Sequence, residues 1–165
     1  MTIRLRLQST NITSSMAAIK RHKRILAILY VLYVCLLFYF LFFSEGFGRI
    51  GASAEYRYNL QPFREIMRFY RYRHILGNKA FFINVFGNVI AFMPMGFLQP
   101  FLSDKQLRGG LIVLNCFIVS LLVETIQLVF KIGCFDVDDL LLNTLGGLLG
   151  VILYYVFQTW VKREG

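Results

Sequence analysis

The sequence has few of the residues on which disulfide-bonded domains and many soluble enzymes depend. It contains 3 cysteines and 2 histidines among 165 residues. Cys35 and Cys116 fall inside apolar runs and Cys134 falls in a loop, so the cysteines do not suggest a disulfide framework. His22 and His74 lie away from the polar residues of those runs. The chain therefore offers no Ser-His or Cys-His arrangement that would activate a nucleophile.

Acidic residues are also scarce. The chain has 9 Asp or Glu against 18 Lys or Arg, a formal charge of +9, and 57% of its residues are hydrophobic. This apolar share is too high for an ordinary soluble domain of this length. Because the basic residues flank apolar runs, we expect membrane lipid and anionic envelope groups as partners, and no nucleic acid.

Four apolar runs account for most of the chain. Each is about 20 residues long, the length that crosses roughly 30 Å of hydrocarbon as a helix. The runs are Ile25–Phe43, Phe81–Leu102, Leu111–Phe130 and Leu140–Val161. We predict an all-α, multi-pass protein of the cell membrane with four transmembrane helices. Its predicted parts are a basic tail (1–24), the four-helix membrane domain (25–161) and a short C-terminus (162–165).

The charges near the first run predict how the protein faces the membrane. The basic stretch Lys20–Arg24 lies directly against Ile25–Phe43, which favours a cytoplasmic location for that end. Both termini are then cytoplasmic, and the long loop Ser44–Ala80 is extracytoplasmic. The preceding tail, Met1–Ala18, is polar without sustained periodicity, and we expect it to be flexible. Although Ala52–Ala54 resembles a signal-peptide cleavage site, the apolar run is longer than usual for a signal peptide, and we favour an uncleaved anchor.

The long loop contains a helical pattern between Pro62 and Leu76. Apolar residues recur there at helical spacing, and Arg64, Arg68 and Arg71 repeat on another face. Pro62 suits the first turn of such a helix. We predict an amphipathic helix at the membrane surface, and two interpretations of its arginines stay open. They lie among lipid phosphates, or they bind an anionic envelope polymer or a lipid-linked cell-wall precursor.

Polar residues inside the predicted spans are costly in lipid unless other helices satisfy them. In the third span, the spacing of Ser120, Glu124 and Gln127 places them on one helical face. Glu124 either has a ligand, proton or metal role, or accepts hydrogen bonds from Asn84 or Asn88 and locks the bundle. At the start of the fourth span, at least one acid of the sequence Asp136-Val137-Asp138-Asp139 is expected to cap the helix.

Successive spans alternate in direction, so these polar residues converge at one depth. We expect a band about 10 Å deep in one half of the membrane, open to the long loop. Its predicted ligand-binding residues are Asn84, Asn88, Glu124, Gln127, Asp136, Asp139 and Asn143. Gly146 and Gly150 are expected to permit close helix packing and are candidate contacts in a homo-oligomer.

Four spaced motifs resemble those of the VanZ-like family of small bacterial membrane proteins. They are Asn59-Leu60-x-Pro62-Phe63, Asn84-x-x-Gly87-Asn88-x-x-x-Phe92-x-Pro94-x-Gly96, Ser120-x-x-x-Glu124-x-x-Gln127 and Asp136-x-Asp138-Asp139-x-x-x-Asn143-x-x-Gly146-x-x-x-Gly150. The resemblance covers about residues 25–160. It departs at Cys134, where relatives often carry a basic or small polar residue. The family is named for a protein linked to teicoplanin resistance, so the resemblance implies an envelope function related to glycopeptide antibiotics.

Three classes of function follow from these observations. We favour a non-enzymatic module that binds a lipid-linked or cell-wall-related ligand, with no cofactor. The second class is a metal-dependent intramembrane enzyme, with Glu124 as general base and Asp136 or Asp139 holding the metal. The third is a small proton-coupled transporter in which Glu124 titrates.

Overall fold

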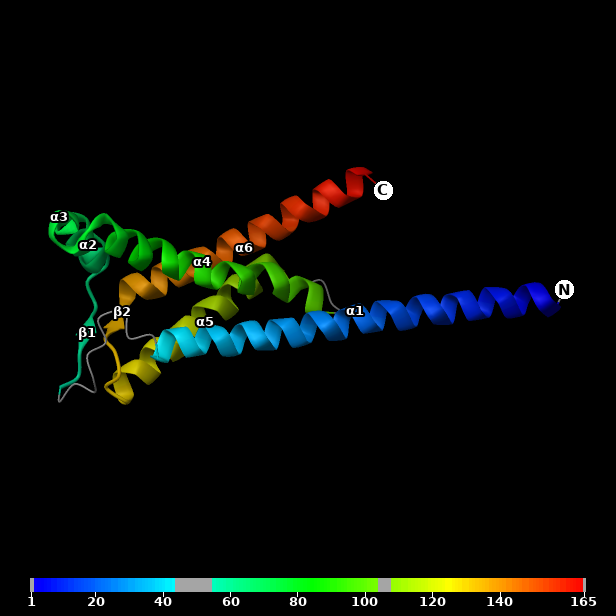
Figure 1. Ribbon diagram of the computed structural model, residues 1–165, viewed down its shortest axis with the longest axis horizontal. Coiled ribbons are helices and arrows are strands. Elements are labelled where there is room, and N and C mark those ends of the chain that lie inside the picture. The colour runs from blue at the N-terminus through cyan, green and yellow to red at the C-terminus, as the bar shows by residue number, and fades with distance from the viewer. Residues whose placement is uncertain (1, 44–54, 104–107, 165) are drawn as a thin grey trace.

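In a computed structural model the chain is a bundle of long helices with a short extension at one end (Figure 1). The structure describes residues 2–43, 55–103 and 108–164. The elements in chain order are α1 (Thr2–Phe43), β1 (Tyr58–Asn59), α2 (Arg64–Arg71), α3 (Arg73–Leu76), α4 (Asn78–Leu102), α5 (Gly109–Val129), β2 (Phe135–Asp136) and α6 (Val137–Glu164). The two-residue strands β1 and β2 pair in parallel. The prediction of an all-α fold is confirmed.

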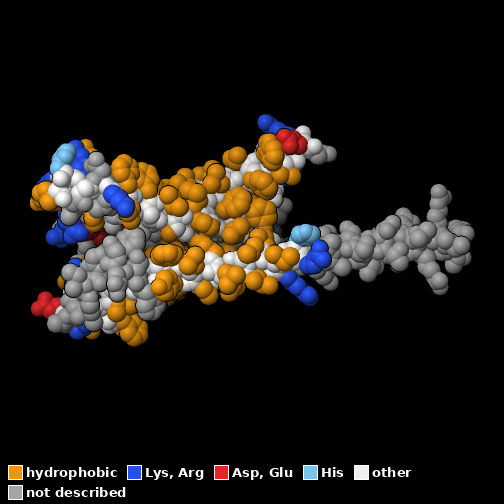
Figure 2. Space-filling view, in the orientation of Figure 1, with side chains coloured by type: hydrophobic (Ala, Val, Ile, Leu, Met, Phe, Trp, Pro, Cys, Tyr) orange, Lys and Arg blue, Asp and Glu red, His pale blue; other side chains and the backbone are white. Residues whose placement is uncertain are grey.

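Four helices are long and apolar enough to cross a membrane, judged by length and composition. The spans are Arg21–Phe42, Phe81–Leu102, Gly109–Val129 and Val137–Glu164. Hydrophobic side chains cover the visible outer face of the bundle (Figure 2). Among the described residues, the buried polar side chains are those of Asn59, Ser120, Glu124, Gln127, Asp136, Asp138 and Asn143. An apolar exterior around a polar interior suits a lipid environment, where polar groups must be satisfied inside the protein.

Glycine permits unusually close packing between α4 and α6. A Cβ atom at Gly146 would overlap the carbonyl oxygen of Val89. One at Gly150 would likewise overlap the carbonyl oxygen of Met93. The expectation of close packing is therefore confirmed. The suggestion that these two glycines join copies of the chain is corrected, because α4 of the same chain already covers them.

Two local predictions differ from the structure. The segment Met1–Ala18 was expected to be flexible, but α1 is helical from Thr2, since neither Gly nor Pro interrupts residues 2–43. The possible cleavage site at 52–54 lies outside the described residues. The predicted surface helix begins at Arg64, not at Pro62, and Tyr72 divides it into α2 and α3.

The shifted start of α2 has a structural cause at Phe63. This residue is the N-cap and adopts a left-handed conformation with φ of 66°. Pro62 consequently precedes the helix and does not occupy its first turn. The conformation at Phe63 directs the first amides of α2 toward α6, where a carboxylate accepts them.

Candidate functional site

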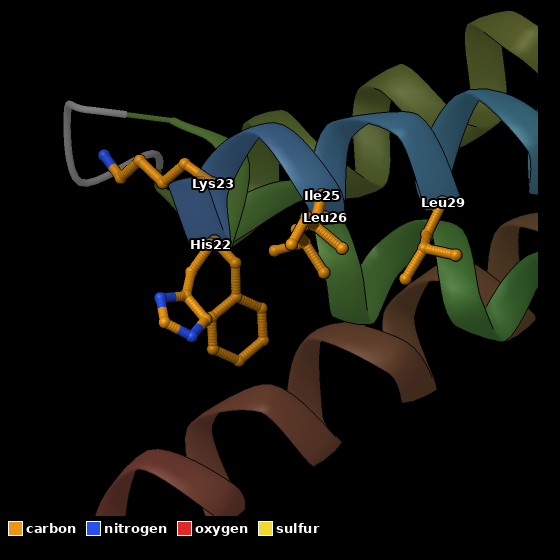
Figure 3. A pocket seen from close by; sticks show the side chains of 6 residues that line it. His22, Lys23, Ile25, Leu26 and Leu29 are labelled. Atoms are coloured by element: carbon orange, nitrogen blue, oxygen red, sulfur yellow. The ribbon is translucent and has the colours of Figure 1, made fainter. Parts of the chain in front are cut away.

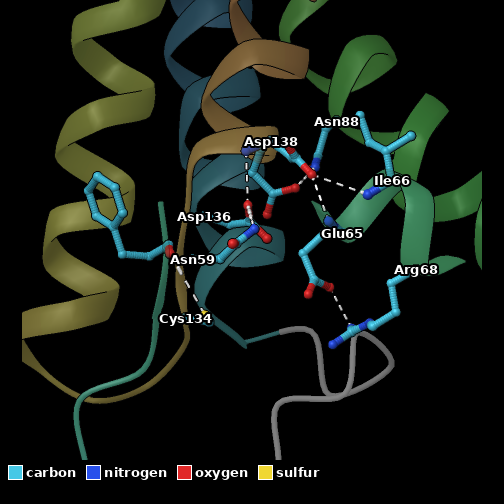
Figure 4. Close-up of polar contacts among 10 residues, drawn as sticks. Asn59, Glu65, Ile66, Arg68, Asn88, Cys134, Asp136 and Asp138 are labelled. Carbon is cyan, nitrogen blue, oxygen red and sulfur yellow. Dashed lines mark hydrogen bonds and ion pairs between the residues drawn. The ribbon is translucent and has the colours of Figure 1, made fainter. Parts of the chain in front are cut away.

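Asp138 fastens the start of α2 to the start of α6. Its carboxylate accepts hydrogen bonds from the backbone N–H groups of Phe63, of Glu65 at 2.8 Å and of Ile66 at 3.2 Å (Figure 4). The first amides of a helix have no partner within that helix, and a carboxylate also complements the helix dipole. The α2 N-cap residue supplies no side-chain bond itself. Asp138, 1% exposed, thus caps a helix that precedes it by more than seventy residues.

Asp136 connects three further segments. Its Oδ1 atom accepts the backbone N–H of Asp138 at 2.9 Å, which caps α6 as expected for an acid at a helix start. The same atom accepts a hydrogen bond from Asn59 Nδ2 at 3.1 Å, beside the β1–β2 pairing. The backbone N–H of Asp136 donates to Glu124 Oε2 at 2.9 Å. Asp136 therefore joins β1, α5 and α6.

A second level of contacts lies deeper in the bundle. Asn88 on α4 donates to Asp139 Oδ1 at 2.5 Å, and Asn143 on α6 donates to Ser120 Oγ at 2.9 Å. Asn143 is 1% exposed, and within the described part of the chain its Oδ1 atom has no hydrogen-bond partner. The two contacts link α6 to α4 and to α5.

We call one end of the bundle the motif end. It consists of β1, α2, β2 and the adjoining ends of α4, α5 and α6. The structure gathers there the predicted residues Asn88, Glu124, Asp136, Asp139 and Asn143. Their predicted role in ligand binding stays a prediction. The predicted locking role of Glu124 has one donor in the backbone amide of Asp136, while Asn88 donates to Asp139.

The remaining two predicted residues lie outside this cluster of contacts. Gln127 is buried and donates to the carbonyl oxygen of Leu41 at 2.9 Å, which attaches α1 to α5. Asn84 is half-buried on α4. Gln127 thus positions a helix, and Asn84 stays a candidate contact for a ligand.

Asp138, Asn59 and Glu65 were not among the site residues predicted from the sequence. Asp138 and Asn59 stand in two of the spaced motifs, which was the available signal, but nothing in the sequence paired them. Glu65 forms a 2.5 Å ion pair with Arg68 and carries an amide that Asp138 accepts. The sequence had indicated an amphipathic helix in this stretch, with its arginines as the candidate binding residues.

Burial raises the pKa of two carboxyl groups outside the spans. The pKa of Glu65 is raised above its ordinary value mainly by burial, while Arg68 lowers it and Asp136 raises it. The pKa of Asp136 is also raised by burial, against the opposing hydrogen bonds from the Asp138 amide and Asn59. Protonation of these groups is therefore easier in the folded protein than in an unfolded chain.

The basic patch predicted on the surface helix is present on α2. Arg64, Arg68 and Arg71 are all exposed, and the guanidinium of Arg68 lies 5.2 Å from the ring centre of Phe69. Three arginines on one short helix favour contact with phosphate or carboxylate groups. Across the described ranges, no group of three His, Cys, Asp or Glu side chains has an arrangement that could hold a metal ion.

Comparison with known proteins places the whole motif end inside one family match. The sequence model of the VanZ/LLP1 family matches residues 30–158. Protein VanZ of Enterococcus faecium is 39% identical over 75 residues, a match that covers 44% of this chain and 45% of that protein. This chain thus matches less than half the length of that relative. No solved structure shows a significant match.

Proposed function

The chain belongs to the VanZ/LLP1 family, and from this premise we propose that it binds an anionic, lipid-linked ligand of the bacterial envelope at its motif end. As a consequence of this binding, the protein lowers the susceptibility of the cell to teicoplanin-type glycopeptides. The supporting observation is that Asp138 fixes a helix with three exposed arginines to the membrane bundle.

The anchoring of α2 matters because it gives the arginines a defined position. An amphipathic helix that lies on the membrane surface without contacts to the rest of the protein presents its charges in many orientations. Ordering those charges when a ligand binds costs entropy. In this protein two motif acids and Asn59 hold the start of α2 and the preceding strand. The arginine face is therefore organised before a ligand arrives, which favours specific recognition over general attraction to lipid.

The surface of α2 indicates what kind of ligand it fits. The guanidinium groups of Arg64, Arg68 and Arg71 suit phosphate and carboxylate oxygens. On the same helix Met67 and Tyr70 expose 57% and 51% of their surface, which provides apolar contact next to the charges. A molecule with an anionic head and a hydrocarbon anchor, such as a polyprenyl phosphate or a wall precursor attached to one, satisfies both features.

The enzyme and transporter hypotheses receive less support from these contacts. Glu124, the proposed base or proton carrier, accepts the amide of Asp136, and Asp139 accepts the side chain of Asn88. Both acids thus hold segments of the protein together. A non-enzymatic binding module is the simplest function for such an arrangement.

Binding is tested with the full-length protein and vesicles of two compositions. One contains a polyprenyl phosphate, and the other contains the uncharged polyprenol of equal chain length. Replacing Arg64, Arg68 and Arg71 with Gln should weaken association with the phosphate vesicles by on the order of a hundredfold, at about 1 kcal/mol per basic residue. A matched control replaces Arg108, Lys162 and Arg163, which are also exposed, with Gln and so removes the same charge.

The cellular consequence is tested by antibiotic susceptibility at matched membrane levels. Wild type and the control variant should protect against teicoplanin, and the α2 variant should not, while an unrelated wall antibiotic should show no difference. Equal binding of all three proteins to both vesicles would refute the proposed ligand. Intact binding without any protection would refute the link to glycopeptide resistance alone.

A further inference from the structure

A cavity lies at the opposite end of the bundle from the motif end. It occupies about 540 Å³ between α1 and the carboxyl end of α4 (Figure 3). It is lined by His22, Lys23, Ile25, Leu26, Leu29 and Phe101. None of these residues belongs to the contacts that hold the motif end, so a function of this α1 cavity is separate from the function proposed above.

The lining residues divide the cavity into a polar rim and an apolar slot. His22 and Lys23 stand at the amino-terminal side of the α1 segment, and Ile25, Leu26 and Leu29 follow. From Lys23 to Leu29 the helix advances by about 9 Å. Phe101 on α4 faces this slot from the other side. The result is an open apolar groove along α1 with an imidazole and an ammonium group at one end.

The dimensions and exposure of the cavity favour an occupant from the bilayer. Its volume falls within the range of roughly 300–1,000 Å³ that is usual for small-molecule pockets. Ile25 and Leu29 are 49% and 55% exposed, so the slot opens sideways toward lipid. Burying a polar solute among Leu and Phe side chains would cost free energy, whereas an acyl chain suits them.

The charge at this end of the bundle is complementary to an anionic headgroup. The first 43 residues contain six Lys or Arg and no Asp or Glu. Among the described residues, this end carries Arg21, Lys23, Arg24, Arg108, Lys162 and Arg163 against Glu164. Basic pockets between transmembrane helices are known to bind anionic lipid headgroups.

We propose that the α1 cavity is a binding site for an anionic phospholipid of the adjacent leaflet. One acyl chain lies along Leu26 and Leu29 against Phe101, and the phosphate lies at the rim beside His22 and Lys23. Such a lipid fills the space between α1 and α4 and packs α1 against the rest of the bundle.

The test uses mass spectrometry of the full-length protein. The protein is released from bilayers into the gas phase, and the lipid that stays bound to it is measured. The bilayers contain phosphatidylglycerol or phosphatidylcholine with identical acyl chains. Leu26→Trp fills the slot, and Ile28→Trp, at a 60% exposed residue that does not line it, is the matched control. Lys23→Gln removes a rim charge, and Lys162→Gln removes one charge elsewhere at the same end.

Wild type, Ile28→Trp and Lys162→Gln should each retain phosphatidylglycerol in preference to phosphatidylcholine. Leu26→Trp should abolish this preference, and Lys23→Gln should weaken it about fivefold, the effect of roughly one basic residue near an anionic lipid. Equal retention of both lipids by wild type would overturn the proposal. So would equal losses in the cavity variants and their controls, because the effect would then not be local to the cavity.

Discussion

The two ends of the bundle are held together by different chemistry. At the motif end, hydrogen bonds accepted by the carboxylates of Asp136, Asp138 and Glu124 join segments that are far apart in the sequence. At the other end, α4 and α6 meet through contacts between aromatic rings, and we call it the aromatic end. The ring of Phe101 lies 4.9 Å from that of Tyr154 and 6.1 Å from that of Phe157, measured between centres.

This difference shows where the structure is most specific. Apolar contacts between helices have little hydrophobic driving force in lipid, because the lipid tails are equally apolar. Directional hydrogen bonds and close glycine packing therefore decide which helix faces which. The motif residues supply the hydrogen bonds at the motif end and the glycine contacts in the middle of α4 and α6, whereas the aromatic end leaves room for the α1 cavity. We therefore place ligand recognition at the motif end and lipid packing at the other.

The largest expected effect comes from the glycine contact that joins both ends. Gly150→Ala places a methyl group against the Met93 carbonyl oxygen, and forcing α4 and α6 apart should lower the free energy of unfolding by about 3 kcal/mol or more. Gly87→Ala is the control, since the nearest atom to its new methyl is 4.0 Å away. Thermal unfolding in detergent measures both. Similar stability of the two variants would show that α4 and α6 do not depend on this contact.

Removing the hydrogen bonds between Asp138 and α2 at the motif end should have the next largest effect on the free energy of unfolding. Asp138→Asn keeps the shape of the side chain but loses the charged acceptor of the α2 amides, at a cost of about 2–3 kcal/mol. Release of α2 should also let this segment unfold locally, so that trypsin can cleave the backbone after Arg64, Arg68 and Arg71. Rapid cleavage in this variant, with wild-type α2 resistant, is the expected result. Equal resistance would mean that another contact anchors α2.

Removing ring contacts at the aromatic end should lower the free energy of unfolding by less, and it should leave the motif end unchanged. Phe101→Ala removes ring contacts with Tyr154 and Phe157, each worth roughly 0.5–1.5 kcal/mol, and the expected total is about 1–2 kcal/mol. Trypsin resistance of α2 should be unchanged, because no motif bond is touched. If α2 became sensitive, the two ends would not be independent.

The smallest expected effect is a dependence on pH at the motif end. Because burial raises the folded pKa of Glu65 and Asp136, the folded state holds protons that an unfolded chain releases near pH 4. Stability contributed by these groups is therefore present at low pH and declines as pH rises through the folded pKa values. Glu65→Gln should flatten this decline in a series of melting curves. A profile identical to wild type would contradict the assignment.

The spans and their relative depth could be predicted from sequence because each depends on a local property. Hydropathy over about twenty residues identifies a membrane helix. Alternating direction then brings Asn88, Glu124 and Asp139 to one level without further information. The capping of α6 by Asp136 was equally local, since an acid at a helix start is a pattern within a few residues.

The connections between distant segments could not be predicted in this way. The strands β1 and β2 have two residues each, too few for a recognisable alternation. Asp138 satisfies amides that lie more than seventy residues earlier, and one sequence contains no sign of such a pairing. Gly146 and Gly150 allowed close packing against any helix, so their actual partner, α4, appeared only in three dimensions.

The most direct test of this account is hydrogen exchange at the backbone amides of Glu65 and Ile66 in the full-length protein in lipid nanodiscs. Both amides donate to Asp138. We expect strong protection in wild type and fast exchange in Asp138→Asn, with amides of the central α4–α6 contact unchanged in both. Equal exchange of Glu65 and Ile66 in the two proteins would contradict the claim that Asp138 anchors the arginine helix to the membrane bundle.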